Sequence, residues 1–193
     1  MKIAFIALSI IPEFNLGILN AWIGTFPIML LPLIFRLFNR SAFIDRAAAR
    51  EGYNKSEKRM VDYTMAVYYL ILLYSIVLPL KFDTNSFYVG LAVYVIAISC
   101  LLITYFNFKS TPRNQLVTHG IFRLSRNPFY STTIIAFLGV GMASLSWLLI
   151  LLTIIMAILQ HQVVLAEERI CEAQYGKEYL EYKARVPRYL LFF

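Results

Sequence analysis

Residues 120–131, GIFRLSRNPFYS, place two arginines, an Asn-Pro pair and a tyrosine at the edge of a long apolar run. A segment that enters a bilayer normally carries neutral residues, so these charges need partners or access to water. In one interpretation, Arg123 and Arg126 are interfacial cations, Asn127 caps the next helix and Pro128 takes its first turn. In the other, the same residues have a functional role.

A second group of reactive side chains follows the last apolar run, in AEERICEAQYGKEYLEYKARVPRY at 166–189. A carboxylate, a thiol and two rings recur every four residues, which aligns them on one helical stripe: Glu167, Cys171, Tyr175 and Tyr179. We expect Gly176 to end this helix and residues 177–185 to form a short second helix that Pro187 closes. The pair would cover the end of the preceding helices.

His161 lies between Gln160 and Gln162 near the end of the last apolar run. Its imidazole could deprotonate an amine or a thiol near pH 7. The alternative is an interfacial polar residue that anchors the helix. His119 lies in a polar loop and the two cysteines are isolated, so the spacing predicts no metal site.

The composition determines which elements must position these residues. Of the 193 residues, 60% are hydrophobic and only 15% are charged, and the mean hydropathy is +0.66. A soluble globule needs more charge on its surface, so these values indicate an integral membrane protein. Neither a repeat nor a low-complexity tract is present, which argues against a duplicated transporter fold.

Four apolar stretches are long enough to cross a bilayer: 16–35, 61–80, 86–106 and 129–164. The last is too long for one crossing. Glycines and serines near its middle predict a tight turn and two helices, 129–142 and 145–164. We therefore expect an all-α polytopic protein with five transmembrane helices, the last two forming a tight hairpin. Residues 1–106 would hold three helices and a basic loop, and residues 107–193 the polar loop, the helical hairpin and the C-terminal cap helices.

The basic residues indicate the orientation. Segments 36–60, 107–128 and 165–193 hold seven, four and five Lys or Arg, which is 16 of the 18 in the chain. The positive-inside rule places all three segments in the cytoplasm and the N-terminus outside. Attraction to anionic lipid headgroups accounts for the net charge of +7, so no nucleic acid is needed as a partner.

The segments NQLVTHGIFRLSRNPFY and EERICEAQYGKEYLEYKARVPRY, about 40 residues apart, resemble the isoprenylcysteine carboxyl methyltransferase family and related phospholipid methyltransferase-like enzymes. The shared pattern is Leu-Val, a Gly before an aromatic residue, Arg-(His or Asn)-Pro-x-Tyr, Glu-Glu, and Gly-x-x-Tyr-x-x-Tyr ending in Val-Pro. It covers roughly residues 105–189. The resemblance implies S-adenosylmethionine at the cytoplasmic ends of the last helices, a capping helix over it, and a lipophilic or amphiphilic acceptor that enters from the bilayer.

Motif position then assigns the residues. The expected cofactor contacts are Asn107, Asn114, Gln115, Leu116, Val117, Phe122, Asn127, Pro128, Phe129, Tyr130 and Glu167. The expected catalytic residues are Arg126, Glu168 and His161. A carboxylate only accepts hydrogen bonds, which suits Glu167 to a ribose hydroxyl or an ammonium group. The aromatic faces would contact the sulfonium through cation–π interactions.

One position departs from the pattern. Family members that methylate the prenylcysteine carboxylate have an arginine four residues before the position of Glu167, and this chain has Val163 there. Either another cation, Arg123, Arg126 or Arg169, binds the carboxylate, or the acceptor is not a carboxylate.

We therefore expect a membrane methyltransferase most similar to protein-S-isoprenylcysteine carboxyl O-methyltransferase. N-methylation of a phospholipid amine and S-methylation of a thiol are the alternatives within this class. A sterol-type membrane reductase would need a nicotinamide site and a larger chain. A non-enzymatic scaffold would have no affinity for the cofactor.

Overall fold

The computed structural model describes residues 14–38, 51–112 and 115–189, and within them the chain is helical, with no strand longer than an isolated bridge. This agrees with the predicted all-α fold. The elements in chain order are α1 (Trp22–Phe38), α3 (Lys55–Val77), α4 (Asn85–Ser110), the 3-10 turn η1 (Gly120–Arg123), α5 (Pro128–Ala143), α6 (Trp147–Tyr175) and α7 (Lys177–Arg185).

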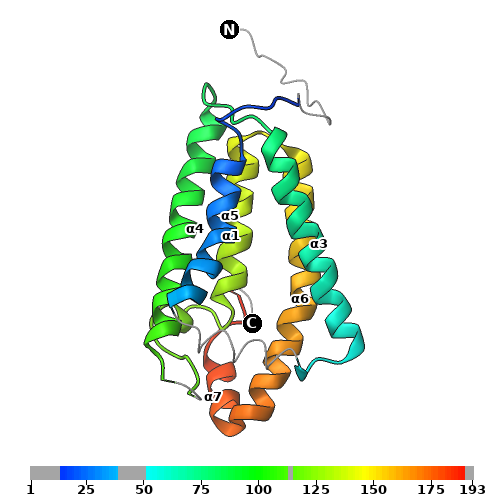
Figure 1. Ribbon diagram of the computed structural model, residues 1–193. Helices are drawn as coiled ribbons and strands as arrows, with labels where there is room; N and C mark the ends of the chain where they lie inside the picture. Colours follow the sequence, from blue (N-terminus) through cyan, green and yellow to red (C-terminus); the bar gives the residue numbers. More distant parts are fainter. Residues whose placement is uncertain (1–13, 39–50, 113–114, 190–193) are drawn as a thin grey trace.

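The long helices run side by side as one bundle (Figure 1). α4 packs most extensively against α5, and α6 packs against both α3 and α5. The end of α4, η1, the start of α5, the end of α6 and α7 all lie at one end of the bundle. The turns that follow α3 and α5 lie at the opposite end, where the Lys81 amide donates to the Ala143 carbonyl at 3.1 Å.

Three helices are long and apolar enough to cross a membrane, namely α3, α4 and α6. This confirms a membrane protein. The helices α1 and α5 are apolar but shorter, and α5 extends only about 24 Å for its 16 residues. α6 has 29 residues and extends about 44 Å, beyond the roughly 30 Å of hydrocarbon, so its polar C-terminal part projects out of the apolar layer. The count of five crossings and the orientation stay predictions.

The first helix begins later than predicted. Residues 16–21 were expected to be part of a span, but α1 starts at Trp22. The Asn20 side chain donates to the Asn15 carbonyl at 2.5 Å and to the Ile76 carbonyl at 2.7 Å, and the Ala21 amide donates to the Leu78 carbonyl at 2.8 Å. These bonds hold the segment along the last turn of α3 and the residue that follows it, and its backbone is therefore not free to form a helix.

The predicted turn within 129–164 is confirmed, with α5 ending at Ala143 and α6 starting at Trp147. Leu145 has a positive φ of 51°, and the Ser146 hydroxyl caps α6 by accepting from the Leu149 amide at 3.2 Å. Gly139 has a packing role within α5. A Cβ added there would lie 2.8 Å from the Gly90 carbonyl oxygen, so the pair lets α4 and α5 approach closely.

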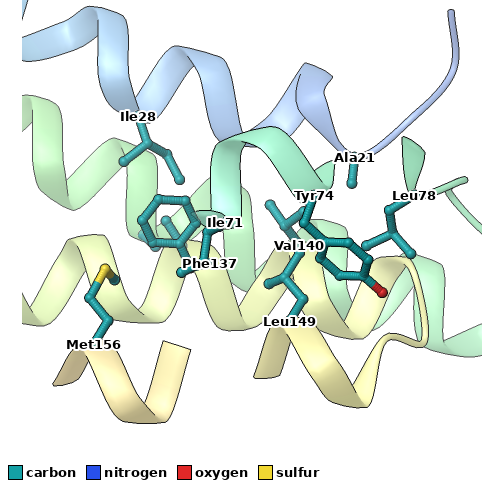
Figure 2. Close-up of a cluster of buried hydrophobic side chains, with 11 residues drawn as sticks. Ala21, Ile28, Ile71, Tyr74, Leu78, Phe137, Val140, Leu149 and Met156 are labelled. Carbon is teal, nitrogen blue, oxygen red and sulfur yellow. The ribbon is translucent and has the colours of Figure 1, made fainter. Parts of the chain in front are cut away.

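The core contains side chains from α1, α3, α4, α5 and α6, and Figure 2 shows Ile28, Ile71, Phe137 and Met156 gathered in it. Hydroxyl groups within this apolar region bond to each other. Thr25 and Ser75 lie 2.7 Å apart, which joins α1 to α3. Because each hydroxyl finds a partner, the helices meet without burying unsatisfied polar groups at this contact.

The end of α6 corrects a second prediction. A separate tail helix was expected after residue 164, but α6 continues without a break to Tyr175. Gly176 then ends it as predicted, with φ of 53° and its amide bonded to the Glu172 carbonyl, and α7 follows over the expected residues. Only α7 and the chain after it fold back over the bundle end (Figure 1).

Candidate active site

The two segments that the sequence singled out meet at one end of the bundle. The Tyr130 hydroxyl at the start of α5 donates to Glu167 Oε1 on α6 at 2.6 Å. Three residues before Tyr130, the Asn127 side-chain Nδ2 donates at 2.9 Å to Oε1 of Glu168, the residue after Glu167 on α6. The loop that enters α5 and the polar part of α6 therefore form one continuous site.

Glu168 is the centre of the buried part of this site, with 4% of its surface exposed. Arg126 donates to its Oε1 from Nε and Nη2, both at 3.3 Å. Arg188 donates from Nε at 3.1 Å to Oε1 and from Nη2 at 3.0 Å to Oε2. With Asn127, three side chains bind this carboxylate, and hydrogen bonds to Glu168 raise the pKa of Arg188 above its usual value.

The C-terminal segment, residues 183–189, is bound to the loop before α5. Arg126 Nη1 donates to the Lys183 carbonyl at 2.9 Å and also to the Val186 carbonyl. The Arg126 amide donates to the Pro187 carbonyl at 2.9 Å, and the Ser125 hydroxyl to the Arg188 carbonyl at 3.0 Å. Arg126 was predicted to be catalytic, and its guanidinium is directed to protein partners in this arrangement.

α7 adds a buried aromatic contact between the C-terminal part of the chain and the loop before α5. The Tyr182 hydroxyl donates to the Phe122 carbonyl at 2.6 Å, and Tyr179, Tyr182 and Val186 form a small core with Leu116. Burial raises the pKa of both tyrosines well above the usual value for a phenol. They are therefore neutral donors and packing groups at physiological pH.

Glu167 has different surroundings from its neighbour. Its Oε1 accepts from Tyr130 and, at 3.3 Å, from the Tyr53 hydroxyl in the segment before α3. Tyr53 packs in a small cluster with Val163 and Ala166. Sequence reasoning missed Tyr53, because no local pattern around it predicts contact with a residue 114 positions away.

The loop between α4 and α5 is organised by Asn107. Its Oδ1 accepts from the Ile121 amide at 3.0 Å, and a Cβ on Gly120, which has φ of 60°, would overlap this side chain. Gln115 is exposed and Val117 is half-buried. Asn114, one of the predicted cofactor contacts, lies outside the described residues.

The predicted cap of α5 is half correct. Pro128 does take the first turn, but the Asn127 side chain makes no capping bond and points to Glu168 instead. The charge-assisted bond from Asn127 Nδ2 to the buried carboxylate fixes the side chain in an orientation in which Oδ1 accepts from no amide of the first turn. Phe129 follows, with its ring centroid 4.8 Å from Tyr105 and 6.2 Å from Phe122.

A groove of about 660 Å³ lies beside this polar cluster, between α5 and α6. It is lined by Tyr130, Ser131, Ile134, Ile135, Leu138, Ile154, Ala157, Ile158, Gln160, His161, Gln162 and Tyr189. Most of these are apolar, and the polar ones gather at the end nearest Glu167. There, His161 Nδ1 lies 3.0 Å from the Tyr189 hydroxyl.

The site has two adjoining parts, which are the polar residues around Glu167 and Glu168 and the groove between α5 and α6. Tyr130 belongs to both, because its side chain lines the groove while its hydroxyl bonds Glu167. Within the part of the chain that the structure describes, no three His, Cys, Asp or Glu side chains group as metal ligands. The described side chains of the site offer hydrogen bonding, charge and an apolar surface.

A family model described as phospholipid methyltransferase matches residues 82–178, half of the chain. The matched part runs from the turn before α4 into α7 and so includes Asn107, Tyr130 and Glu167. No curated protein and no solved structure matches this chain.

Proposed function

The chain belongs to the phospholipid methyltransferase family and is a membrane methyltransferase, and from this premise we propose that it transfers the methyl group of S-adenosylmethionine to a lipophilic acceptor. The donor would bind at the polar end of the bundle and the acceptor in the α5–α6 groove. We place this end at the cytoplasmic face, in accord with the distribution of basic residues.

The contact that supports this proposal is the bond between Tyr130 and Glu167. One residue borders both a polar cluster and an apolar groove, which is the arrangement needed to bring a polar donor against a lipid acceptor. Holding two reactants in line and excluding water provides roughly 7–11 kcal/mol of barrier reduction in favourable cases.

The donor set around Glu167 fits this cofactor. Its Oε1 accepts from the hydroxyls of Tyr53 and Tyr130. A carboxylate oxygen accepts well from a ribose hydroxyl or an ammonium group, and the rings of Phe122 and Phe129 offer faces for a cation. Glu167, Tyr130, these rings and residues 115–117 would hold the cofactor. When bound, it supplies a methyl carbon already activated by the positive sulfur.

The remaining predicted residues form the wall of the site. Arg126, Asn127 and Glu168 bind each other and the C-terminal segment, and Asn107 shapes the loop below them. We therefore assign these four to positioning. His161 lines the groove and is the candidate to accept a proton from the acceptor.

Carboxyl methylation has no support in the groove. None of its described lining residues is Lys or Arg, and Val163 stands where carboxylate-binding relatives have arginine. Arg126 is bound to Glu168, and Arg169 bonds Glu57 at 2.7 Å on another face. An acceptor that needs no cationic partner fits better.

Calorimetry on the detergent-purified protein tests the proposal. S-adenosylmethionine should bind and NADPH should not. Glu167→Ala should weaken this binding about 10- to 100-fold, since a hydrogen bond to a charged group contributes about 1.5–3 kcal/mol. The matched control is Glu172→Ala, because Glu172 lies on the same helix and bonds Lys183 at the surface. Equal affinity in both variants would refute the cofactor site.

A further inference from the structure

The short segment that leads into α3, residues 51–54, lies against the polar part of α6 (Figure 1). It precedes the part of the chain that the family model matches, which begins at residue 82. Tyr53 in this segment has 8% of its surface exposed and packs with Val163 and Ala166 of α6. Apolar packing explains why the ring is buried, but it does not explain the hydroxyl.

The Tyr53 hydroxyl contacts the carboxylate that the proposed cofactor would meet. It donates to Oε1 of Glu167 at 3.3 Å, and the Tyr130 hydroxyl donates to the same oxygen at 2.6 Å. One donor comes from the segment before α3 and the other from α5. A glutamate side chain has several rotamers, and two donors on one oxygen favour the rotamer in which that oxygen faces both of them. Tyr53 therefore restricts the orientation of Glu167.

Arg169 of α6 fixes the backbone on both sides of Tyr53. Its Nη2 donates to the Gly52 carbonyl at 3.2 Å and to Glu57 Oε2 at 2.7 Å. Glu57 also belongs to the capping box of α3, because its Oε2 accepts from the Asn54 amide at 2.8 Å. The residue before Tyr53 and the first turn after it are thus bound to one guanidinium, which limits how far the tyrosine can move from α6.

We propose that Tyr53 is a positioning residue of the methyl-donor site. Its hydroxyl, together with that of Tyr130, sets the orientation in which Glu167 accepts hydrogen bonds from the donor. This rests on the proposed function, which places Glu167 at the cofactor. The N-terminal half of the chain then contributes to donor binding, although Tyr53 lies outside the residues that the family model matches.

Calorimetry with S-adenosylmethionine on the detergent-purified full chain tests this role. Tyr53→Phe keeps the buried ring and removes only the hydroxyl, and it should weaken donor binding about three- to tenfold. Tyr63→Phe is the matched control. It removes the same hydroxyl from a tyrosine of α3 that has 52% of its surface exposed, and it should bind the donor like the wild type.

A double variant distinguishes an effect through Glu167 from a general loss of packing. Tyr53→Phe should cause no further loss of donor affinity when it is added to Glu167→Ala, because the acceptor of its hydroxyl is already absent. If Tyr53 only stabilised the fold, its substitution would weaken binding by the same factor in both backgrounds.

The same cycle in the melting temperature, measured without any cofactor, tests the contact itself. Tyr53→Phe should lower the melting temperature of the wild type more than that of Glu167→Ala, since only the wild type has the hydrogen bond to lose. Equal decreases in the two backgrounds would show that the hydroxyl does not hold Glu167, and they would overturn the inference.

Wild-type donor affinity in Tyr53→Phe would also overturn it, as would an equal fold-change in both backgrounds. Donor binding that depends on Glu167 but not on Tyr53 refutes this inference alone. If the wild type binds no S-adenosylmethionine, the proposed function is refuted, and the melting-temperature cycle still decides whether Tyr53 orients Glu167.

Discussion

Glu167 and Glu168 are neighbours on α6, yet they belong to different parts of the molecule. Glu168 is buried and is bound by Arg126, Asn127 and Arg188. Glu167 is half-buried and contacts two tyrosine hydroxyls beside the groove. A helix rotates about 100° per residue, so adjacent side chains necessarily face different neighbours.

The comparison teaches that a pair of carboxylates need not share one role. Glu168 neutralises two arginines that come from the loop before α5 and from the C-terminal segment, so its contacts close the end of the bundle. The described hydrogen-bond donors of Glu167 are two neutral tyrosine hydroxyls. We infer that one holds the site together while the other takes part in binding.

The largest expected effect is on stability, and it follows from removing the Glu168 carboxylate. Glu168→Ala leaves two arginines without their buried counter-ion, which should lower the free energy of unfolding by about 3–5 kcal/mol. Glu167→Ala should cost only about 1 kcal/mol, because it removes hydrogen bonds with the neutral hydroxyls of Tyr53 and Tyr130. Chemical denaturation in detergent measures both. Similar losses in the two variants would contradict the division of roles.

Two tyrosine substitutions test the same difference between binding and closure of the bundle end, and their expected effects are smaller. Tyr130→Phe removes the donor to Glu167, and Tyr182→Phe removes the donor to the Phe122 carbonyl. We expect Tyr130→Phe to weaken binding of the methyl donor about tenfold while leaving stability within about 1 kcal/mol of the wild type.

Tyr182→Phe should show the reverse, a loss of about 1 kcal/mol in stability with donor affinity unchanged. Isothermal calorimetry and denaturation on the same preparations separate the two quantities. A loss of affinity in both variants would show that α7 contributes to the binding site directly.

The smallest expected effect depends on pH. Burial raises the pKa of Tyr182 in the folded state, so this tyrosine ionises more readily in the unfolded chain. Its contribution is complete below pH about 10, the pKa of an unperturbed phenol, and decreases above that value. At pH 11 the wild type should therefore lose about 1 kcal/mol more than Tyr182→Phe. The measurement is the free energy of unfolding of both proteins between pH 8 and about 11. An equal decrease in the wild type and in Tyr182→Phe would contradict this prediction.

Much of the architecture follows from local sequence. The density of apolar residues predicts membrane helices, the serines at 144 and 146 mark the turn between α5 and α6, and Gly176 ends α6 where expected. These features succeed because chain length, backbone freedom and capping depend on near neighbours. The motif residues also predict which two segments meet.

The tertiary structure alone decided what each side chain contacts. One interpretation had Asn127 cap α5, but its Nδ2 donates to the buried Glu168 and its Oδ1 makes no capping bond. Tyr53 reaches Glu167 from 114 residues away, and the C-terminal segment binds Arg126 through backbone carbonyls that no sequence pattern reveals.

The sequence by itself therefore determined a helical membrane protein with a polar site at one end, because composition and periodicity are properties of the chain. The structure decided that Arg126 and Glu168 close the end of the bundle, and that Tyr130, which lines the groove, bonds Glu167. These depend on the rotation and packing of helices, which arise only when distant segments meet.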